Sequence, residues 1–301
     1  MLKTKRRYQI TPRDIRLLQF LWRWKLAPTA ALASERFFPG KNLARGYNRL
    51  LDLRKLGLVE CHADQRLINY AWTLTKRGFL AISDDLPALR ELGFKSENFT
   101  HDLLVLAFHL GDFLNGVPEG LKLFSEQELR RYAITEYPSW VTKSDFHRPD
   151  GYIGFSRDDK ILSVAIEVEL NRKVASAYEN VGIFYAEHQN IHRVLWLVPS
   201  VVMAKRIQCN IADSVSTRHD IHNFVLLKDF QQNGCASKIS DGPETGMSVA
   251  EFYQHLPRRK AVEEPWKSTS LALLNTRKSY VKSVTSPRPK KTVEPILTSN
   301  Y

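Results

Sequence analysis

Residues 148–173, RPDGYIGFSRDDKILSVAIEVELNRK, decide the fold of the second half of this chain. Two apolar runs, residues 151–155 and 161–170, predict strands, and the polar SRDDK between them predicts a tight turn. The stretch is therefore expected to form a β-hairpin. Carboxylates nevertheless occupy three positions at the ends of these strands, where a hydrophobic residue would be ordinary: Asp150, Glu167 and Glu169.

The centre of the turn determines which residues of the two strands face each other. If the turn is centred on its two aspartates, Asp150 lies opposite Glu167 and Ile153 lies opposite Val164. Side chains alternate between the two faces along a strand, so Glu167 and Glu169 share a face. We therefore expect the three carboxylates to converge on one patch.

Such a patch needs a compensating positive charge. Like charges that face each other on a sheet are destabilising, and partial burial raises the cost. A divalent cation is the simplest answer, because Mg²⁺ and Mn²⁺ prefer carboxylate oxygens. The alternative is a solvent-facing edge on which the acids sit in water, but the apolar residues around them favour a central strand. Asp150, Glu167 and Glu169 are thus the expected ligands of Mg²⁺ or Mn²⁺.

The elements around the hairpin predict an α/β sandwich. The uninterrupted apolar run at residues 194–198 is typical of a strand that is covered on both faces. The expected elements outside the hairpin are a helix at 98–114, a strand at 121–126, a helix at 171–187, a strand at 194–198, a helix at 201–215 and a strand at 224–227.

The first 82 residues have a different pattern. Thr11, Pro12 and Asp14 combine an N-cap, a proline at the first helical position and an acid at the third, which predicts a helix that runs to about residue 24. Three helices followed by a two-stranded ribbon indicate a winged helix. The expected elements are helices at 12–24, 28–38 and 41–56, with Gly57 closing the third, strands at 58–61 and 70–74, and a fourth helix that opens at 75–78.

The net charge of +12 is unevenly distributed and divides the chain into three parts. Residues 1–82 carry 17 Lys and Arg against 5 Asp and Glu, residues 83–256 carry 17 against 24, and residues 257–301 carry 10 against 3. Basic segments are candidates for contact with a phosphate backbone, although they can also serve solubility alone. The last part lacks sustained periodicity and is expected to be a flexible basic tail.

The third helix is the expected DNA-binding element. An α-helix fits the major groove, where Arg, Lys and Asn can contact base edges. Winged helices also dock proteins, but the local excess of positive charge favours double-stranded DNA. The candidate DNA contacts on this helix and in the ribbon turn are Lys41, Asn42, Arg45, Asn48, Arg49 and Arg66.

Other classes of protein are disfavoured. Three widely spaced cysteines support neither a disulfide framework nor a zinc site, which suggests a reducing, cytoplasmic environment. No signal peptide and no apolar run long enough to span a membrane are visible. The local signatures of nucleophilic hydrolases and phosphate-binding loops are missing from the sequence.

The hairpin resembles a known nuclease pattern. Pro149-Asp150, sixteen residues, and then Glu167-Val168-Glu169 is similar to the PD-(D/E)xK core of restriction-endonuclease-like enzymes. With THDLLV at 100–105 and FSEQEL at 124–129, residues 10–230 resemble the replication-relaxation family, which includes mobilisation-C type plasmid relaxases. The resemblance implies a winged-helix domain at 1–82 and a nuclease-like domain at 83–256. It further implies metal-dependent DNA nicking at an origin-like site in plasmid or mobile-element mobilisation, with other mobilisation or replication proteins as partners.

One position departs from this pattern. The last residue of the motif is usually lysine, and here it is Glu169. Lys173 is the nearest replacement, so the resemblance implies Asp150, Glu167, Glu169 and Lys173 as the catalytic set. An acid at position 169 would instead serve a second metal, or mark a degenerate core in a noncatalytic DNA-binding regulator of replication or transcription.

Neighbouring side chains leave further alternatives open. His101 and His147 could add to the carboxylate patch or be ordinary partly buried and loop histidines. Tyr178 and Tyr185 could supply the tyrosine nucleophile of a relaxase, but packing explains both at least as well.

Overall fold

The computed structural model describes residues 9–34, 36–40, 43–64, 68–111, 121–157 and 160–255. The expected tail at 257–301 and the candidate DNA contacts Lys41, Asn42 and Arg66 lie outside these residues. The described part is a mixed α/β fold with a three-stranded and a six-stranded sheet. None of its helices is both long and apolar enough to cross a bilayer.

The described part of the N-terminal unit contains four α-helices and three short strands. Its antiparallel sheet has the order β1-β3-β2. The elements are α1 (Pro12–Trp24), β1 (Leu26–Pro28), α2 (Thr29–Leu32), α3 (Leu43–Lys55), β2 (Val59–Asp64), β3 (Ile68–Leu74) and α4 (Lys76–Leu80).

Local sequence signals explain the first helix. The Thr11 hydroxyl accepts a hydrogen bond from the backbone N–H of Asp14, and the Asp14 carboxylate accepts one from the backbone N–H of Thr11, which is a capping box. Leu17, Leu18 and Leu21 then line the buried face. The helix ends at Trp24, as predicted.

Other predictions for this unit need correction. The second helix covers Thr29–Leu32 and not residues 28–38, because Phe37 and Phe38 enter the core from a turn that follows Ser34. Strand β2 continues to Asp64, where a turn was expected from residue 62. Strand β1 was not predicted, and its pairing with β3 adds a third strand to the expected two-stranded ribbon.

The C-terminal unit is built around the six-stranded sheet, in the order β4-β5-β6-β7-β8-β9. Strands β4 to β6 are antiparallel, β6 to β8 are parallel, and β9 is antiparallel to β8. The elements are α5 (Phe99–Leu110), β4 (Leu121–Ser125), α6 (Glu126–Arg131), β5 (Gly151–Arg157), β6 (Lys160–Val168), α7 (Ala175–Glu187), β7 (Ile191–Val198), α8 (Val201–Ser214), β8 (His222–Leu226), α9 (Leu227–Asn233), β9 (Ile239–Asp241) and α10 (Val249–His255).

The predicted register of the hairpin is confirmed. Ile153 pairs with Val164, and Gly151 pairs with Ile166, which brings Asp150 and Glu167 to the same end of the two strands. The predicted strands and helices occur in the expected order, but helix α6, which was not predicted, separates β4 from β5. Helix α7, however, begins at Ala175 and not at residue 171.

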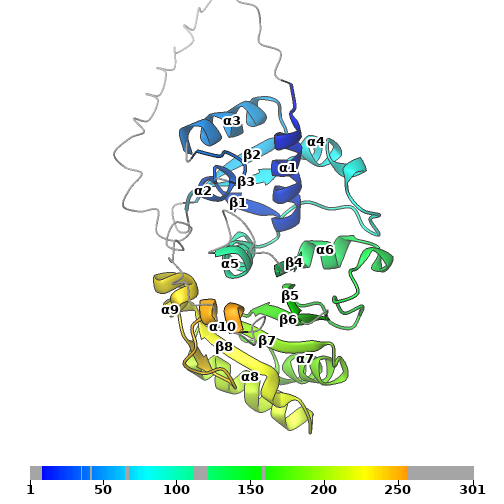
Figure 1. The fold of residues 1–301 in the computed structure, drawn as a ribbon, viewed down its shortest axis with the longest axis vertical. Coiled ribbons are helices and arrows are strands. Elements are labelled where there is room, and N and C mark those ends of the chain that lie inside the picture. The colour runs from blue at the N-terminus through cyan, green and yellow to red at the C-terminus, as the bar shows by residue number, and fades with distance from the viewer. Residues whose placement is uncertain are drawn as a thin grey trace, which may run out of the picture.

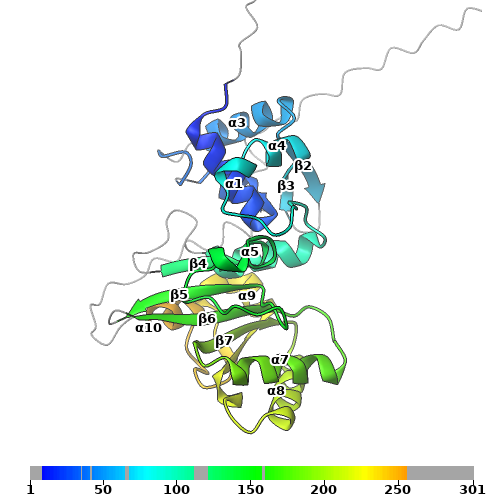
Figure 2. The ribbon, with the colours of Figure 1, turned by 90° about the vertical axis from the view of Figure 1, so that its right-hand side faces the viewer.

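Helix α5 lies between the two units in both views of the fold (Figures 1 and 2). It contacts β1 of the N-terminal unit on one side and β6 of the large sheet on the other. Helices α7 and α8 pack together on the opposite face of that sheet. The buried hydrophobic residues of both units form one continuous core, so the N-terminal unit has a fixed position on the C-terminal unit.

Candidate active site and nucleic-acid interface

The predicted nuclease residues lie where β5 begins and β6 ends. Asp150 directly precedes β5, and its carboxylate Oδ2 accepts a hydrogen bond of 2.7 Å from the backbone N–H of Val168. The next residue must be a glycine, because a Cβ atom on Gly151 would lie 2.4 Å from Nε2 of the buried His109. Asp150 is thus held in place by the backbone of the neighbouring strand.

A protonated histidine compensates the charge of Asp150. Nε2 of His101, on α5, lies 3.4 Å from Asp150 Oδ1, and Nδ1 lies 3.5 Å from Asp102 Oδ1. Burial lowers the pKa of His101, but the two carboxylates outweigh this effect and raise it to about 10. Burial also raises the pKa of Asp150, and the contact with His101 brings it below its usual value. Both groups are therefore charged at neutral pH.

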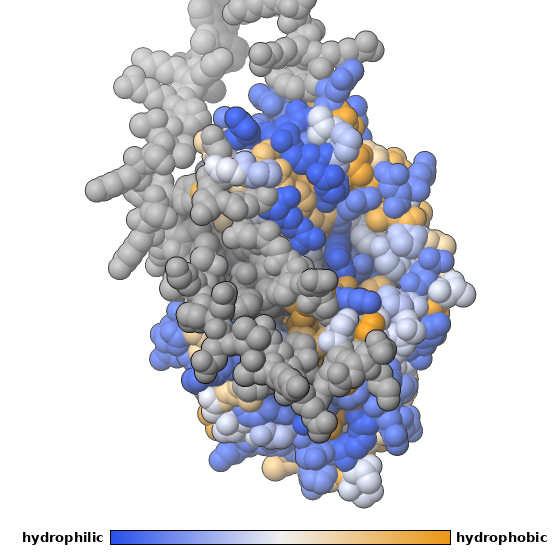
Figure 3. Space-filling view, viewed as in Figure 1, coloured by the Kyte–Doolittle hydropathy of each residue, from blue (hydrophilic) through white to orange (hydrophobic). Residues whose placement is uncertain are grey.

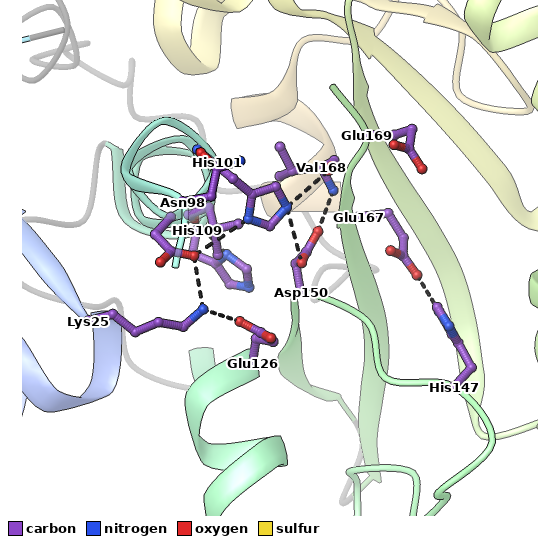
Figure 4. Close-up of polar contacts among 12 residues, drawn as sticks. Lys25, Asn98, His101, His109, Glu126, His147, Asp150, Glu167, Val168 and Glu169 are labelled. Carbon is purple, nitrogen blue, oxygen red and sulfur yellow. Dashed lines mark hydrogen bonds and ion pairs between the residues drawn. The ribbon is translucent and has the colours of Figure 1, made fainter. Parts of the chain in front are cut away.

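Glu167 has a different set of partners. Its Oε1 lies 2.7 Å from Nε2 of His147 and accepts a 2.5 Å hydrogen bond from the hydroxyl of Tyr185. In Figure 4 its carboxylate points toward His147, whereas that of Asp150 points toward His101. Burial and the negative charge of Glu167 raise the pKa of Tyr185 well above its usual value. Tyr185 is consequently a fixed donor to Glu167, which argues against a role as nucleophile.

Glu169 is paired with Lys173, the predicted replacement for the missing lysine. The ammonium lies 2.8 Å from Glu169 Oε2, and Glu169 is only 5% exposed. Burial lowers the pKa of Lys173, but Glu169, Glu167 and Asp150 together raise it above its usual value. The Lys173 side chain remains 60% exposed, so it presents its positive charge to solvent at the edge of the carboxylate site.

The three residues lie at the same end of β5 and β6, but each carboxylate has its own cationic or hydrogen-bonding partner. Within the described ranges, no three or more His, Cys, Asp or Glu side chains are close enough together to hold a metal ion. Mg²⁺ commonly needs only one or two protein carboxylates and keeps several waters. The expected convergence of three carboxylates on one metal site is therefore not found among the described residues. The carboxylates of Asp150 and Glu167 point to different partners, and a Mg²⁺ site here would use one or two of these oxygen donors.

The exposed side of α3 contributes to a shallow depression of about 430 Å³. Arg45 and Asn48, both predicted DNA contacts, are exposed on this helix. The upper part of the molecule in Figure 3, where α3 lies, carries many hydrophilic side chains. The depression is lined by Arg13, Ala44, Arg45, Asn48, Arg49 and Asp52.

Arg13 was not among the predicted contacts. It comes from the first turn of α1, and its guanidinium lies 4.5 Å from the ring centre of Phe38. The sequence does not show that α1 packs beside α3, so it offered no signal that Arg13 would lie next to Arg45 and Asn48. Three arginines from two helices therefore line the depression together with Asp52, and one of them, Arg49, is paired with Asp14.

Arg49 has a structural role. Its Nε and one terminal nitrogen bind the two oxygens of Asp14 at 2.9 and 2.6 Å, and Asp14 is fully buried. Burial raises the pKa of Asp14, but the hydrogen bonds from Arg49 and Thr11 lower it below its usual value. The Arg49 guanidinium thus joins α3 to the start of α1 in addition to lining the depression.

Comparison of the chain with protein-family models, with curated proteins and with solved structures finds no match. The sites described above consequently stand on the geometry and chemistry of these residues.

Proposed function

We propose that this chain is a DNA-binding, metal-dependent nicking endonuclease of the relaxase type, acting in plasmid or mobile-element mobilisation. Its N-terminal unit would be a winged helix that binds double-stranded DNA, and its C-terminal unit a restriction-endonuclease-like core. The observation that carries the proposal is the position of Asp150 and Glu167 at the same end of β5 and β6, with Glu169 and Lys173 beside them.

The order of elements in the N-terminal unit supports the winged-helix assignment. Three helices, α1 to α3, precede the β2–β3 ribbon, and β1 completes a small antiparallel sheet. In winged helices the third helix enters the major groove. Here that helix exposes Arg45 and Asn48 beside Arg13, so the basic depression is the proposed DNA interface.

In the C-terminal unit, Asp150 and Glu167 would hold Mg²⁺ or Mn²⁺. Such an ion activates a nucleophile and stabilises the charge that develops on a scissile phosphate. The surrounding residues have supporting roles: the backbone N–H of Val168 orients Asp150, and Tyr185 orients Glu167. The exposed ammonium of Lys173 lies where it could contact a phosphate, and Glu169 keeps it at the site.

Nicking of supercoiled plasmid DNA tests this proposal. The wild-type protein should convert supercoiled DNA to open circles with Mg²⁺ or Mn²⁺ and not with a chelator. Asp150→Asn and Glu167→Gln should retain DNA binding and lose nicking, because these carboxylates lie away from the basic depression. Absence of nicking by wild-type protein that binds DNA and is supplied with either metal would refute the catalytic assignment.

A specific observation favours a second candidate function. Glu169 occupies the usual lysine position of the motif, and each carboxylate is already neutralised or hydrogen-bonded within the fold. A noncatalytic DNA-binding regulator of replication or transcription, with a degenerate nuclease core, would have these features. In that case the Asp150 and Glu167 variants would behave as the wild type in every DNA assay.

A further inference from the structure

A lysine of the N-terminal unit is buried against the C-terminal unit. Lys25 follows α1, and its ammonium lies 2.9 Å from Asp102 Oδ1 and also pairs with the carboxylate of Glu126. Only 12% of its side chain is exposed. Its φ angle is +63°, a conformation that favours glycine and strains other residues. The backbone conformation at position 25 does not favour a lysine. The ion pairs of its ammonium with Asp102 and Glu126 explain why a lysine is present there.

The contacts of Lys25 continue to the carboxylate site. Asp102 Oδ1, which binds Lys25, lies 3.5 Å from Nδ1 of His101, and Nε2 of the same ring lies 3.4 Å from Asp150. That ring nitrogen also lies 3.1 Å from the carbonyl oxygen of Val168, whose N–H binds Asp150. Figure 4 shows this series of side chains, from Lys25 at one edge to Asp150 beside β6.

Other contacts also join the two units. Trp22 stacks on Tyr132 with ring centres 5.3 Å apart, and its indole N–H donates to the carbonyl of Gly93 at 3.0 Å. Buried ion pairs are often no more stabilising than apolar residues of similar size. Apolar packing could therefore dock the units without Lys25. What the charged series adds is a connection that ends on Asp150.

We propose that Lys25 and His101 are positioning residues that hold Asp150 in its orientation, so that the carboxylate site is complete only when the N-terminal unit is docked. Lys25 fixes Asp102, Asp102 fixes the His101 ring, and the ring fixes one oxygen of Asp150 while Val168 binds the other. The role as a metal site rests on the proposed function, but the connection from Lys25 to Asp150 does not.

The connection is tested without metal by a double-mutant cycle on the full chain. Lys25→Met, Asp150→Asn and the double variant are compared with the wild type by melting temperature. If Lys25 and Asp150 are connected, the fall in melting temperature of the double variant should differ from the sum of the two single falls by about 2 °C or more. A matched cycle of Arg193→Met with Asp150→Asn should be additive, since Arg193 pairs with Glu244 and takes no part in the series. Additivity in the Lys25 cycle would overturn the proposal.

The positioning role is tested by calorimetric titration with Mn²⁺. Loss of a residue that orients a ligand should weaken metal binding by about tenfold or more, so Lys25→Met should bind Mn²⁺ more weakly while keeping wild-type DNA affinity. Lys25→Arg, which retains the charge, should restore binding. If Lys25→Met does not fold, His101→Gln replaces it in both measurements. Unchanged Mn²⁺ affinity would refute the positioning role. Wild-type protein that binds no Mn²⁺ would refute the metal site, and the cycle would still decide whether Lys25 and Asp150 are connected.

Discussion

Removal of the Arg49 side chain should destabilise the protein far more than its place beside an open surface depression suggests. Arg49→Met leaves the carboxylate of Asp14, which is fully buried, without its guanidinium partner. Breaking a buried ion pair in this way costs about 3–5 kcal/mol. Asp14 keeps its hydrogen bonds from Thr11, and 15% of the Arg49 side chain is exposed, so we take the lower end, about 3 kcal/mol. For a chain of this size that corresponds to a fall in melting temperature of roughly 6–12 °C.

Thermal melting followed by circular dichroism measures this effect, and its pH dependence identifies the cause. The pKa of Asp14 is lowered by folding, so its contribution to stability is present above its unfolded value of 3.8 and is lost as pH falls through the lower folded value. The difference in melting temperature between the wild type and Arg49→Met should therefore be largest at pH 7. It should become smaller in acid, where the unpaired Asp14 becomes protonated. A variant that melts within a degree of the wild type at pH 7 would refute the structural role of Arg49.

Three further predictions concern function. Arg45→Ala should keep the fold intact and lower the salt slope of DNA binding by about 1, because one phosphate contact is lost; identical salt titrations would remove Arg45 from the interface. Asp150→Ala and Glu167→Ala should each abolish metal-dependent nicking at unchanged DNA affinity, which gel-shift and plasmid assays measure in parallel. Lys173→Ala should slow nicking without weakening Mn²⁺ binding, and full activity of this variant would show that Lys173 does not replace the motif lysine.

The sheet was predictable where the sequence alternates and carries a turn. The hairpin pairing of Ile153 with Val164 followed from strand periodicity around a polar turn, and both are local signals. Strand β9 has three residues and pairs only with β8, so it had no periodicity to detect. The predicted start of α7 was too early: Lys173 donates its backbone N–H to the hydroxyl of Tyr178, and Val174 is the extended N-cap of the helix.

The candidate site was predictable in its residues but not in their orientations. Motif and register brought Asp150, Glu167 and Glu169 to one end of the strands. The partners of these carboxylates come from distant parts of the chain: His101 lies on α5 and Tyr185 lies on α7. The directions of the side chains therefore depend on how those helices pack. His101 and His147 were recognised as candidates, but only tertiary structure could show which carboxylate each one contacts.

The contact of α5 with both units has a consequence for the evolutionary exchange of the N-terminal unit. Recombination that cuts the gene between residues 82 and 83 would separate Trp22 from Tyr132 and Lys25 from Asp102. A foreign module joined there would leave a buried aspartate and an aromatic surface without partners on the recipient. Lineages of this protein should therefore change the binding surface of the N-terminal unit by substitutions on the outer face of α3, and not by wholesale replacement of the first 82 residues.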